Sequence, residues 1–552
     1  MVTLTVMAVT AEGRPWPPAG RLLGSSRPWR SLDGWEILIL ALFAGLSIWV
    51  LGYDLWQSAA LGHVWTGTDG IYPVDQLQYM AWIQDASHHV LVSDMYVLRA
   101  TPHDYLEPLV ALAGGLSALG MAPWAALLLF QPLAVAAIFF AIRTYIHRSL
   151  AGRWERRAAL TLALFFGSFV VLFAPFAGRG RAGAGVPDEW IPFWTWGYLP
   201  GVFAIAALVG ALVAYDRAIR EGRFVWLAPI LGLLASWLHP WQGEELLLIV
   251  LLYELGRRRR AEGGLLKPRE AAGRASSALP WVTIAATLLP LVYYVLLDRL
   301  DPIWRMAQAA NAVPKSPDIV LLPLVPLLVV AALGWRFRPR DFLESTAWLW
   351  LVAALAVYIL CNLGVGSTPL HAFGGIAVPL SVLAVRGARR LGLSRVPRHR
   401  WLAALLVVAV TVPEGLAVVS SVPRYVNSAF IYPDAHRALT YLAEDPRPGG
   451  VLTNLRLGAV IPSMTDRRTY IGETSWSQPD PKLRNHQVRW LFYKHPSPRA
   501  AQKFVLATGA RFVLAPCHVW TDLRRVLAPI LMSVRHFGCA AVYTVRPRAR
   551  SA

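Results

Sequence analysis

The sequence predicts an all-α polytopic membrane bundle of about 11 transmembrane helices, followed by a C-terminal α/β extracytoplasmic domain. Of its 552 residues, 56% are hydrophobic, and the mean hydropathy is +0.44. Apolar runs recur at close to the ~20 residues that cross a bilayer, a length at which a lipid-embedded segment forms a helix. Beyond residue 434 this pattern gives way to shorter units that each resemble a helix followed by a strand.

Eleven apolar runs are predicted to span the membrane: 35–52, 123–142, 158–176, 198–215, 225–238, 241–256, 278–297, 318–334, 345–361, 371–385 and 401–420. A further apolar segment, 106–120, is shorter and contains Gly114, Gly115 and Gly120. We predict that this segment lies in the membrane interface. If it were a span, every later loop would change sides and much of the charge asymmetry between the two sides would vanish.

Basic residues are distributed unequally between the two sides of these spans. The N-terminal tail and the loops on its side contain 28 Lys and Arg, whereas the opposite loops up to residue 371 contain six. The side rich in Lys and Arg is cytoplasmic. We therefore predict a disordered cytoplasmic tail at 1–34, a bundle at 35–422 with its first external loop at 53–122, and an extracytoplasmic domain at 423–552. The net charge of +20 thus follows from topology and does not indicate a nucleic-acid partner.

The first external loop is acidic, with six aspartates against one arginine in residues 53–105. In the stretch GTDGIYPVDQLQYMAWIQDA, Asp69 precedes a predicted helix that carries Asp75 and Tyr79 on one face. A carboxylate held between the membrane surface and protein is costly unless it is used or paired. The alternative is that Asp75 only caps the helix.

A histidine and an aspartate follow later in the same loop, in RATPHDYLEP. His103 and Asp104 suit a proton relay or a pair of metal ligands. The alternative is a solvated turn after Pro102.

The second external loop ends with the aromatic stretch VPDEWIPFWTWGYLPG. Trp194 and Trp196 suit either a sugar-binding surface or an aromatic belt at the membrane interface. A belt does not account for the adjacent Asp188 and Glu189.

The segment SWLHPWQGEE lies between two unusually short predicted spans. Pro240 interrupts the helix, so the turn that holds His239 and Trp241 is expected below the outer surface, inside a cavity. A helical hairpin with a hydrated tip is the alternative.

Cations are sparse on the outer side. Arg305 there, and His371 at the start of the tenth span, would suit the phosphate of a lipid. The neighbouring Arg299 could instead pair with an adjacent aspartate. Cys517 and Cys539 form no metal motif. They either pair in an oxidising compartment or remain two free thiols, which the sequence favours.

The predicted C-terminal domain contains three helix-then-strand units, which indicate a small α/β domain with a partly parallel sheet. Residues 423–552 contain 19 Lys and Arg against 7 Asp and Glu, so the domain is expected to rest on anionic headgroups or to meet an anionic acceptor. Between the units, Arg467, Arg468 and Trp476 would contact a glycan, or form a surface loop.

The predicted order of elements is one span, an external loop opening with an acid in VDQLQYMAWIQDA, a proline-led interfacial segment, a helical bundle and an external domain. This order resembles that of the type C (GT-C) membrane glycosyltransferases of bacteria. The resemblance implies an inverting transferase in the bacterial cytoplasmic membrane. Such an enzyme moves a sugar from a polyprenyl-phosphate donor to a glycan, lipid or protein acceptor outside. It leaves open a divalent metal, Mg²⁺ or Mn²⁺.

By the same resemblance, Asp75 acts as catalytic base or in metal binding, and Glu189 or Asp188 supplies a second acid. Asp69 and Asp75 are farther apart than the acidic pair usual in the family. The residues expected to contact substrate are Tyr79, Asp69, His103, Asp104, Trp194, Trp196, His239, Trp241, Arg305 and His371.

Two other functions fit the same architecture. A transporter or flippase of lipid-linked glycans would show internal repeats and ionisable residues in mid-span, and neither is evident. A non-catalytic envelope-assembly protein would use its external domain for binding alone.

Overall fold

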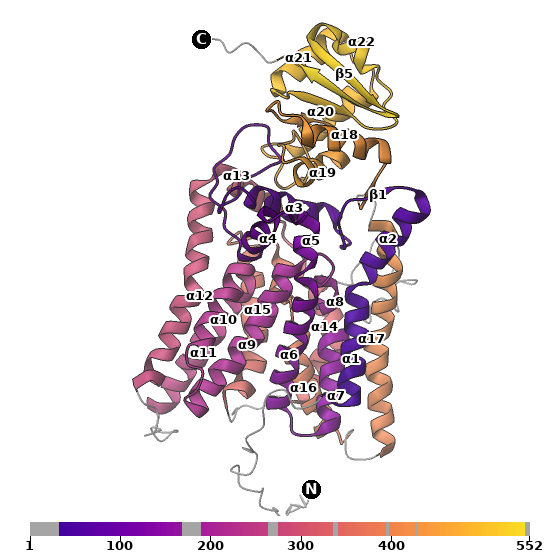
Figure 1. Cartoon of the computed structure of the whole chain (residues 1–552). Coiled ribbons are helices and arrows are strands. Elements are labelled where there is room, and N and C mark those ends of the chain that lie inside the picture. Colours follow the sequence, from indigo (N-terminus) through magenta and orange to yellow (C-terminus); the bar gives the residue numbers. More distant parts are fainter. Residues whose placement is uncertain are drawn as a thin grey trace, which may run out of the picture.

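The computed structural model describes residues 32–167, 189–262, 274–334, 341–392, 397–425 and 429–546. Long helices form a bundle, and a small C-terminal domain lies beyond one end of it (Figure 1). The predicted tail at 1–34 lies almost entirely outside the described residues, as does Asp188.

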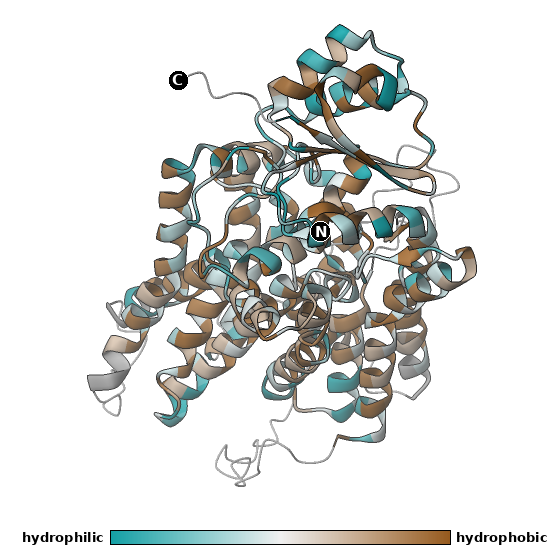
Figure 2. Ribbon diagram, turned by 45° about the horizontal axis from the view of Figure 1, so that its top comes forward, coloured by the Kyte–Doolittle hydropathy of each residue, from teal (hydrophilic) through white to brown (hydrophobic). Residues whose placement is uncertain are grey.

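The bundle is built from roughly aligned helices. They are α1 (Gly34–Ser47), α2 (Trp49–Leu61), α6 (Gln131–Ser149), α7 (Arg153–Phe165), α9 (Leu199–Glu221), α10 (Leu227–Leu238), α11 (Pro240–Glu262), α12 (Arg274–Leu300), α14 (Pro317–Leu333), α15 (Phe342–Asn362), α16 (Ala377–Arg390) and α17 (Pro397–Tyr425). Hydrophobic residues recur along these helices, whereas the C-terminal domain is more mixed (Figure 2). This distribution is that of a multi-pass membrane protein.

Within the described residues, six helical segments are long and apolar enough to cross a membrane, or seven if α1 and α2 form one span bent by 40°. The prediction of about 11 spans is therefore confirmed only in its coarser form, a mostly helical multi-pass bundle. The helices α10 and α14 fall short because they have 12 and 17 residues. The predicted run 158–176 extends past residue 167, beyond the described part.

Four shorter helices lie at the end of the bundle that is nearest the C-terminal domain (Figure 1). They are α3 (Pro73–Ala86), α4 (Pro108–Ala118), α5 (Pro123–Leu128) and α13 (Pro302–Asn311). Each begins with a proline, whose fixed backbone angle suits the first helical position. The 11 residues of α4 extend about 16 Å, too little for a hydrocarbon core of about 30 Å. This length agrees with the prediction that 106–120 does not cross.

The C-terminal domain is a mixed four-stranded sheet in the order β3 (Val451–Leu452), β4 (Phe512–Ala515), β6 (Ala540–Val545) and β5 (Leu531–Phe537). Strands β3 and β4 are parallel, and the other pairs are antiparallel. The helices of the domain are α18 (Pro433–Glu444), α19 (Leu455–Thr465), α20 (Pro481–Tyr493), α21 (Pro498–Thr508) and α22 (Leu523–Leu527). The first two predicted units are α18–β3 and α21–β4. The third differs, because its short helix leads into the hairpin β5–β6.

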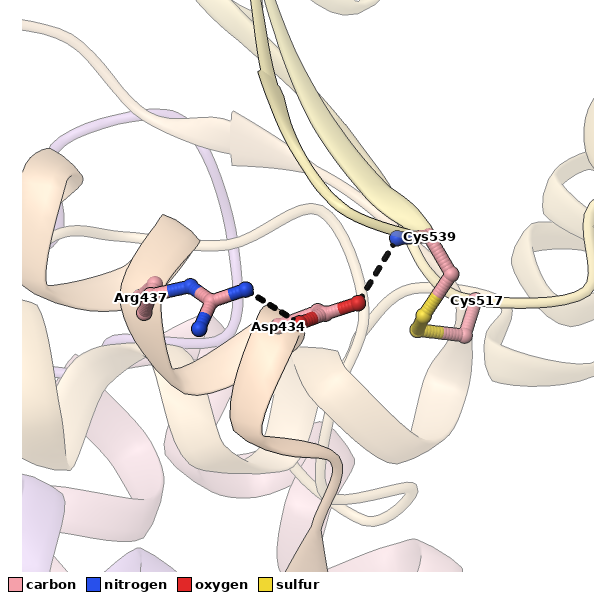
Figure 3. The surroundings of a disulfide bond; sticks show 4 residues. All are labelled: Asp434, Arg437, Cys517 and Cys539. Atoms are coloured by element: carbon pink, nitrogen blue, oxygen red, sulfur yellow. Dashed lines mark hydrogen bonds and ion pairs between the residues drawn. A yellow bond between two sulfur atoms is a disulfide. The ribbon is translucent and has the colours of Figure 1, made fainter.

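A disulfide joins Cys517 to Cys539, beside the turn of this hairpin (Figure 3). The favoured prediction of two free thiols is therefore wrong, since the chain reverses at Gly538 and brings Cys539 toward the segment after β4. Asp434 accepts a hydrogen bond from the Cys539 amide at 2.8 Å. Gly538 has a φ of +63°, and a side chain there would collide with the Asp434 carboxylate. Cys361 is buried and free.

The loop predicted to be the first external loop, residues 53–122, and the C-terminal domain are joined by backbone pairing. Strand β1 (Val64–Trp65) pairs with β2 (Phe430–Ile431), and the Thr469 amide donates to the Met95 carbonyl at 3.0 Å. The interfacial helix α3 packs directly against α19. The loop, the interfacial helices and the domain therefore form one layer over the bundle.

Candidate active site

Helix α3 is sandwiched between α4 and α5 on one side and α19 on the other (Figure 1). Nine of its 14 residues are buried. Asp75 and Tyr79, one helical turn apart, both keep accessible surface, as expected for two residues on one face. Trp82, which follows one turn after Tyr79 in the sequence, is buried.

Asp75 combines accessibility with an unfavourable environment for negative charge. Burial of the surrounding region, followed by the nearby Glu473 carboxylate, raises the pKa of Asp75 to about 7. Desolvation and a like charge both favour the neutral form of a carboxyl group. A reachable group that exchanges protons near neutral pH suits general base catalysis.

Two acids from other segments lie in this region, and the charge of one of them, Glu473, acts on both Asp75 and Asp94. Asp94, in the first external loop, is 6% exposed, and its Oδ2 has no hydrogen-bond partner within the described chain. Burial raises the pKa of Asp94 to about 7, although Arg468 and Arg484 oppose the shift. Burial also raises the pKa of Glu473, which follows α19.

The sequence predictions missed Glu473 because it lies almost 400 residues from Asp75 and belongs to a segment interpreted as a glycan-contacting or surface loop. The only local sign of a site in the sequence is that Glu473 comes three residues before a tryptophan, in GETSW. The Trp476 amide donates to Glu473 Oε2 at 2.8 Å, which fixes the carboxylate.

Asp69 occupies a separate position from Asp75. It is 1% exposed, and both its amide and its Oδ1 are bound by the Gln76 side chain. Burial raises the pKa of Asp69 to about 7. A side chain at the adjacent Gly70 would meet the Trp196 carbonyl at 2.7 Å, so this loop packs closely against the end of the second external loop.

That second loop places its aromatic and acidic residues deep in the protein. Glu189 is 1% exposed, and the buried Trp190 packs edge-on against Trp196. The indole nitrogen of Trp196 donates to the Leu46 carbonyl at 2.6 Å. Trp196 therefore holds the loop against α1, so its described contact is a structural one.

The predicted buried turn at Pro240 forms a histidine pair. His239 ends α10 and lies with its Nε2 3.1 Å from Nδ1 of His371, in the 3₁₀ helix Pro369–Phe373. Trp194 packs at a ring distance of 5.3 Å from each histidine, and Trp241 at 4.5 Å from His239. The prediction that this turn is buried is confirmed, because His239 is 3% exposed.

Aromatic rings connect the histidine pair to the C-terminal domain. Tyr198 contacts both histidines and packs 5.9 Å from Tyr79 on α3. Tyr79 contacts Trp82, and Trp82 packs 5.1 Å from Trp476. Trp476 is 7% exposed, so it packs between domain and helix and has little surface left for a glycan.

The remaining predicted residues lie away from Asp75 in the contacts that the structure describes. His103 contacts Asp85 at 3.4 Å. The Asp104 carbonyl accepts from the Tyr293 hydroxyl at 2.7 Å, and burial raises the pKa of the Asp104 carboxyl. Arg305 is exposed on α13.

The two arginines predicted to contact a glycan are used in folding. Arg467 binds backbone carbonyls of the domain, including that of Leu442 at 2.7 Å. Arg468 binds the Asp94 carbonyl and donates to Ser93 Oγ at 2.8 Å. The Arg468 contacts hold the loop that contains Ser93 and Asp94 to the domain.

A pocket of about 280 Å³ opens at this junction. Its lining includes Arg99 and Arg484, with the Arg484 guanidinium 5.0 Å above the Tyr470 ring. Two cations beside aromatic faces suit an anionic sugar.

Metal-ligating atoms converge in two groups of three within the described ranges. They are Asp85, His89 and His103, and Asp434, Cys517 and Cys539. The two cysteines of the second group are consumed by the disulfide. Neither group contains Asp75, so the described residues around Asp75 do not fit a three-ligand metal site. The divalent metal suggested by the sequence resemblance stays a prediction.

Comparison with known proteins decides the fold. No protein-family profile matches the chain, and no curated protein matches its sequence. The apo oligosaccharyltransferase of Archaeoglobus fulgidus, a GT-C enzyme, superposes with a TM-score of 0.54 at 15% identity, over 88% of this chain and 70% of that chain. The chain has the GT-C fold.

Two further structures are similar to a lesser degree. The oligosaccharyltransferase AglB of Archaeoglobus fulgidus, in complex with an inhibitory peptide and a dolichol-phosphate, gives a TM-score of 0.49 at 13% identity, over 89% of this chain and 70% of that one. ArnT from Cupriavidus metallidurans, bound to undecaprenyl phosphate, gives 0.45 at 13% identity, over 93% and 98%. The match to the apo oligosaccharyltransferase, at a TM-score of 0.54, confirms for the fold the resemblance to GT-C enzymes predicted from the sequence.

Proposed function

We propose that this GT-C protein is an inverting membrane glycosyltransferase that moves a sugar from a polyprenyl-phosphate donor to an acceptor on the outer face of the bacterial cytoplasmic membrane. The observation that carries the proposal is Asp75, a half-buried residue on the interfacial helix α3 whose carboxyl group has its pKa raised to about 7. Its position between the bundle and the C-terminal domain supports access to both a membrane-bound donor and an external acceptor.

Asp75 acts in its ionised form as the general base. It accepts the proton of an acceptor hydroxyl while that oxygen forms a bond to the anomeric carbon of the sugar. The bond from that carbon to the donor phosphate breaks, and the phosphate leaves on its lipid with the electron pair. A base with a pKa close to the working pH is both ionised and basic enough for this transfer.

Other predicted residues take supporting roles in the proposal. Tyr79 shares the open face of α3 with Asp75 and positions substrate beside it. Arg305, exposed on α13, is the proposed contact for the donor phosphate. The pair His239–His371 orients the aromatic wall formed by Trp194 and Tyr198, and Glu189 and Asp188 remain proposed second acids.

The acceptor is proposed to bind from the outside. The arginine-lined pocket at Arg99 and Arg484 supports an acceptor with anionic groups. The disulfide Cys517–Cys539 supports an extracytoplasmic location for the C-terminal domain, because disulfides persist in oxidising compartments.

The decisive assay uses the purified full chain in nanodiscs with a panel of radiolabelled polyprenyl-phosphate monosaccharides. We expect sugar transfer with at least one donor, and loss of about 100-fold or more in rate for Asp75→Asn. Asp298→Asn, a partly exposed acid at the outer end of α12, is the matched control and should keep the wild-type rate.

Equal turnover by Asp75→Asn and wild type would reject Asp75 as the base. Movement of the intact lipid-linked sugar across the bilayer without transfer would favour a flippase. Binding of glycan with neither activity would favour an assembly protein.

A further inference from the structure

The end of α3 and the loop that follows bring two histidines and an aspartate together. His89 Nδ1 lies 3.1 Å from Asp85 Oδ1, and His103 Nε2 lies 3.4 Å from the same oxygen. The two imidazole rings are 4.0 Å apart and tilted by 34°. All three ligand atoms lie within 4.8 Å of one another. We propose that Asp85, His89 and His103 bind a Zn²⁺ ion that fixes the first external loop to α3.

The distances between the proposed ligand atoms fit tetrahedral coordination of a metal ion. Zinc bonds of about 2.0–2.1 Å at tetrahedral angles separate neighbouring ligand atoms by roughly 3.3 Å. The two nitrogen–oxygen distances of 3.1 and 3.4 Å lie on either side of that value. Two imidazoles with one carboxylate favour zinc over Mg²⁺ or Ca²⁺, which prefer oxygen ligands.

The three proposed ligands differ in solvent exposure in a way that suits an ion site. The Asp85 side chain is 6% exposed, whereas those of His89 and His103 are 49% and 36% exposed. The carboxylate is therefore fixed, and the imidazoles leave an entry path and a fourth position for water. Three protein ligands with an open position are common in zinc sites.

The carboxylate is also oriented by a neighbouring residue. Asp85 Oδ2 accepts from the Ser93 amide at 2.8 Å and from its hydroxyl at 3.2 Å, which leaves Oδ1 directed at the histidines. Ser93 Oγ in turn accepts from Arg468 of the C-terminal domain at 2.8 Å. Such supporting hydrogen bonds set the geometry of metal ligands.

The ion would therefore brace the junction between loop and domain. The loop that it fixes continues to Asp94 and Tyr96, whose hydroxyl donates to the Ala459 carbonyl on α19. The site is separate from Asp75 and does not depend on sugar transfer. The competing arrangement without metal has both imidazoles donating to one carboxylate oxygen.

Metal binding distinguishes the two arrangements. Full-length protein without a polyhistidine tag is treated with chelator, exchanged into metal-free buffer and titrated with Co²⁺, followed by displacement with Zn²⁺. We expect one Co²⁺ per chain with the visible absorption of tetrahedral cobalt. His89→Ala and His103→Ala should each weaken binding by at least tenfold.

His88→Ala is the matched control, because His88 is adjacent in sequence but faces Asp466 at 3.6 Å. It should bind Co²⁺ as the wild type does. A thermal melt provides a second readout: Zn²⁺ should raise the melting temperature of the wild type and His88→Ala but not of His103→Gln. Absence of stoichiometric uptake by the wild type, or equal uptake by the His89 and His103 variants, would overturn the proposal.

Discussion

Acidic side chains are paired with arginines at the end of the bundle where α1 begins, the lower end in Figure 1. Beneath the C-terminal domain, by contrast, acidic side chains lie near other carboxyl groups. Asp33 contacts Arg157 at 2.9 Å, and Asp216 contacts Arg148 at 3.0 Å and Arg220 at 2.7 Å. Burial tends to raise the pKa of Asp33, but hydrogen bonds from the Glu36 amide and Arg157 outweigh it and lower the pKa to about 2.

The acids beneath the C-terminal domain show the opposite response to burial. The pKa values of Asp69, Asp75 and Asp94 are each raised to about 7, with burial as the main cause. The same residue type is thus stabilised as an anion at one end of the bundle and kept close to neutrality at the other. Paired acids stabilise the fold, whereas an acid with a raised pKa and an accessible oxygen is available for proton transfer.

The largest expected effect on stability is at the end of the bundle where acids pair with arginines. Asp216→Asn should lower the free energy of unfolding by about 2 kcal/mol, because Arg148 and Arg220 lose their buried partner. The loss is limited because Arg148 keeps Glu221 at 3.1 Å and Arg220 keeps Asp341 at 2.8 Å. Asp75→Asn should leave it nearly unchanged, since Asn resembles the neutral form of the acid. Denaturation followed by tryptophan fluorescence would test both variants, and equal losses would contradict the contrast between the two ends.

The next effect concerns the rate of sugar transfer at different pH values. Because Asp75 must be ionised to accept a proton, the rate should rise about tenfold per pH unit up to about pH 7 and then level off. Glu473→Gln removes the neighbouring negative charge, so the midpoint should move to lower pH. A midpoint that stays in place would remove Glu473 from this role.

The smallest effect is on the pH dependence of stability. Between about pH 4 and pH 7, a carboxyl with a raised pKa holds its proton in the folded protein but has lost it in the unfolded chain. Stability should therefore fall as the pH rises through this window. Asp33 has a lowered pKa, so the stability that it contributes is lost as the pH falls below about pH 4.

Thermal melts at pH 5.5 and pH 7.5 would measure this slope. The double variant Asp69→Asn with Asp94→Asn should reduce the difference in melting temperature by about 2–4 °C. Asp434→Asn, an acid that contacts Arg437 on the domain surface, is the control and should keep the wild-type slope. An unchanged slope in the double variant would contradict the assigned pKa values.

The sequence predicted those features that depend on nearby residues. The apolar run at 198–215 became α9, Pro240 ended a helix where expected, and the shortness of 106–120 separated α4 from the spans. The predicted helix carrying Asp75 and Tyr79 is α3, which begins at Pro73. Local pattern is sufficient for these elements, because a helix is closed by hydrogen bonds within four residues.

The rest depends on contacts between distant segments. Arg468 reaches Asp94 and Ser93 across 374 and 375 positions, and no periodicity in either segment indicates the other. The proximity of Glu473 to Asp75 arises in the same way. The cysteine bond was also missed, because pairing depends on how the β5–β6 hairpin folds back rather than on spacing in the chain.

The two-stranded ribbon formed by Val64–Trp65 and Phe430–Ile431 has a consequence for the integrity of the molecule. The polypeptide enters the C-terminal domain between Tyr425 and Ala429, yet this ribbon, Arg468 and the Trp82–Trp476 contact all cross the same boundary without using that connection. A protein nicked there should remain assembled through noncovalent contacts alone. The two fragments, co-expressed from separate reading frames, should therefore purify together.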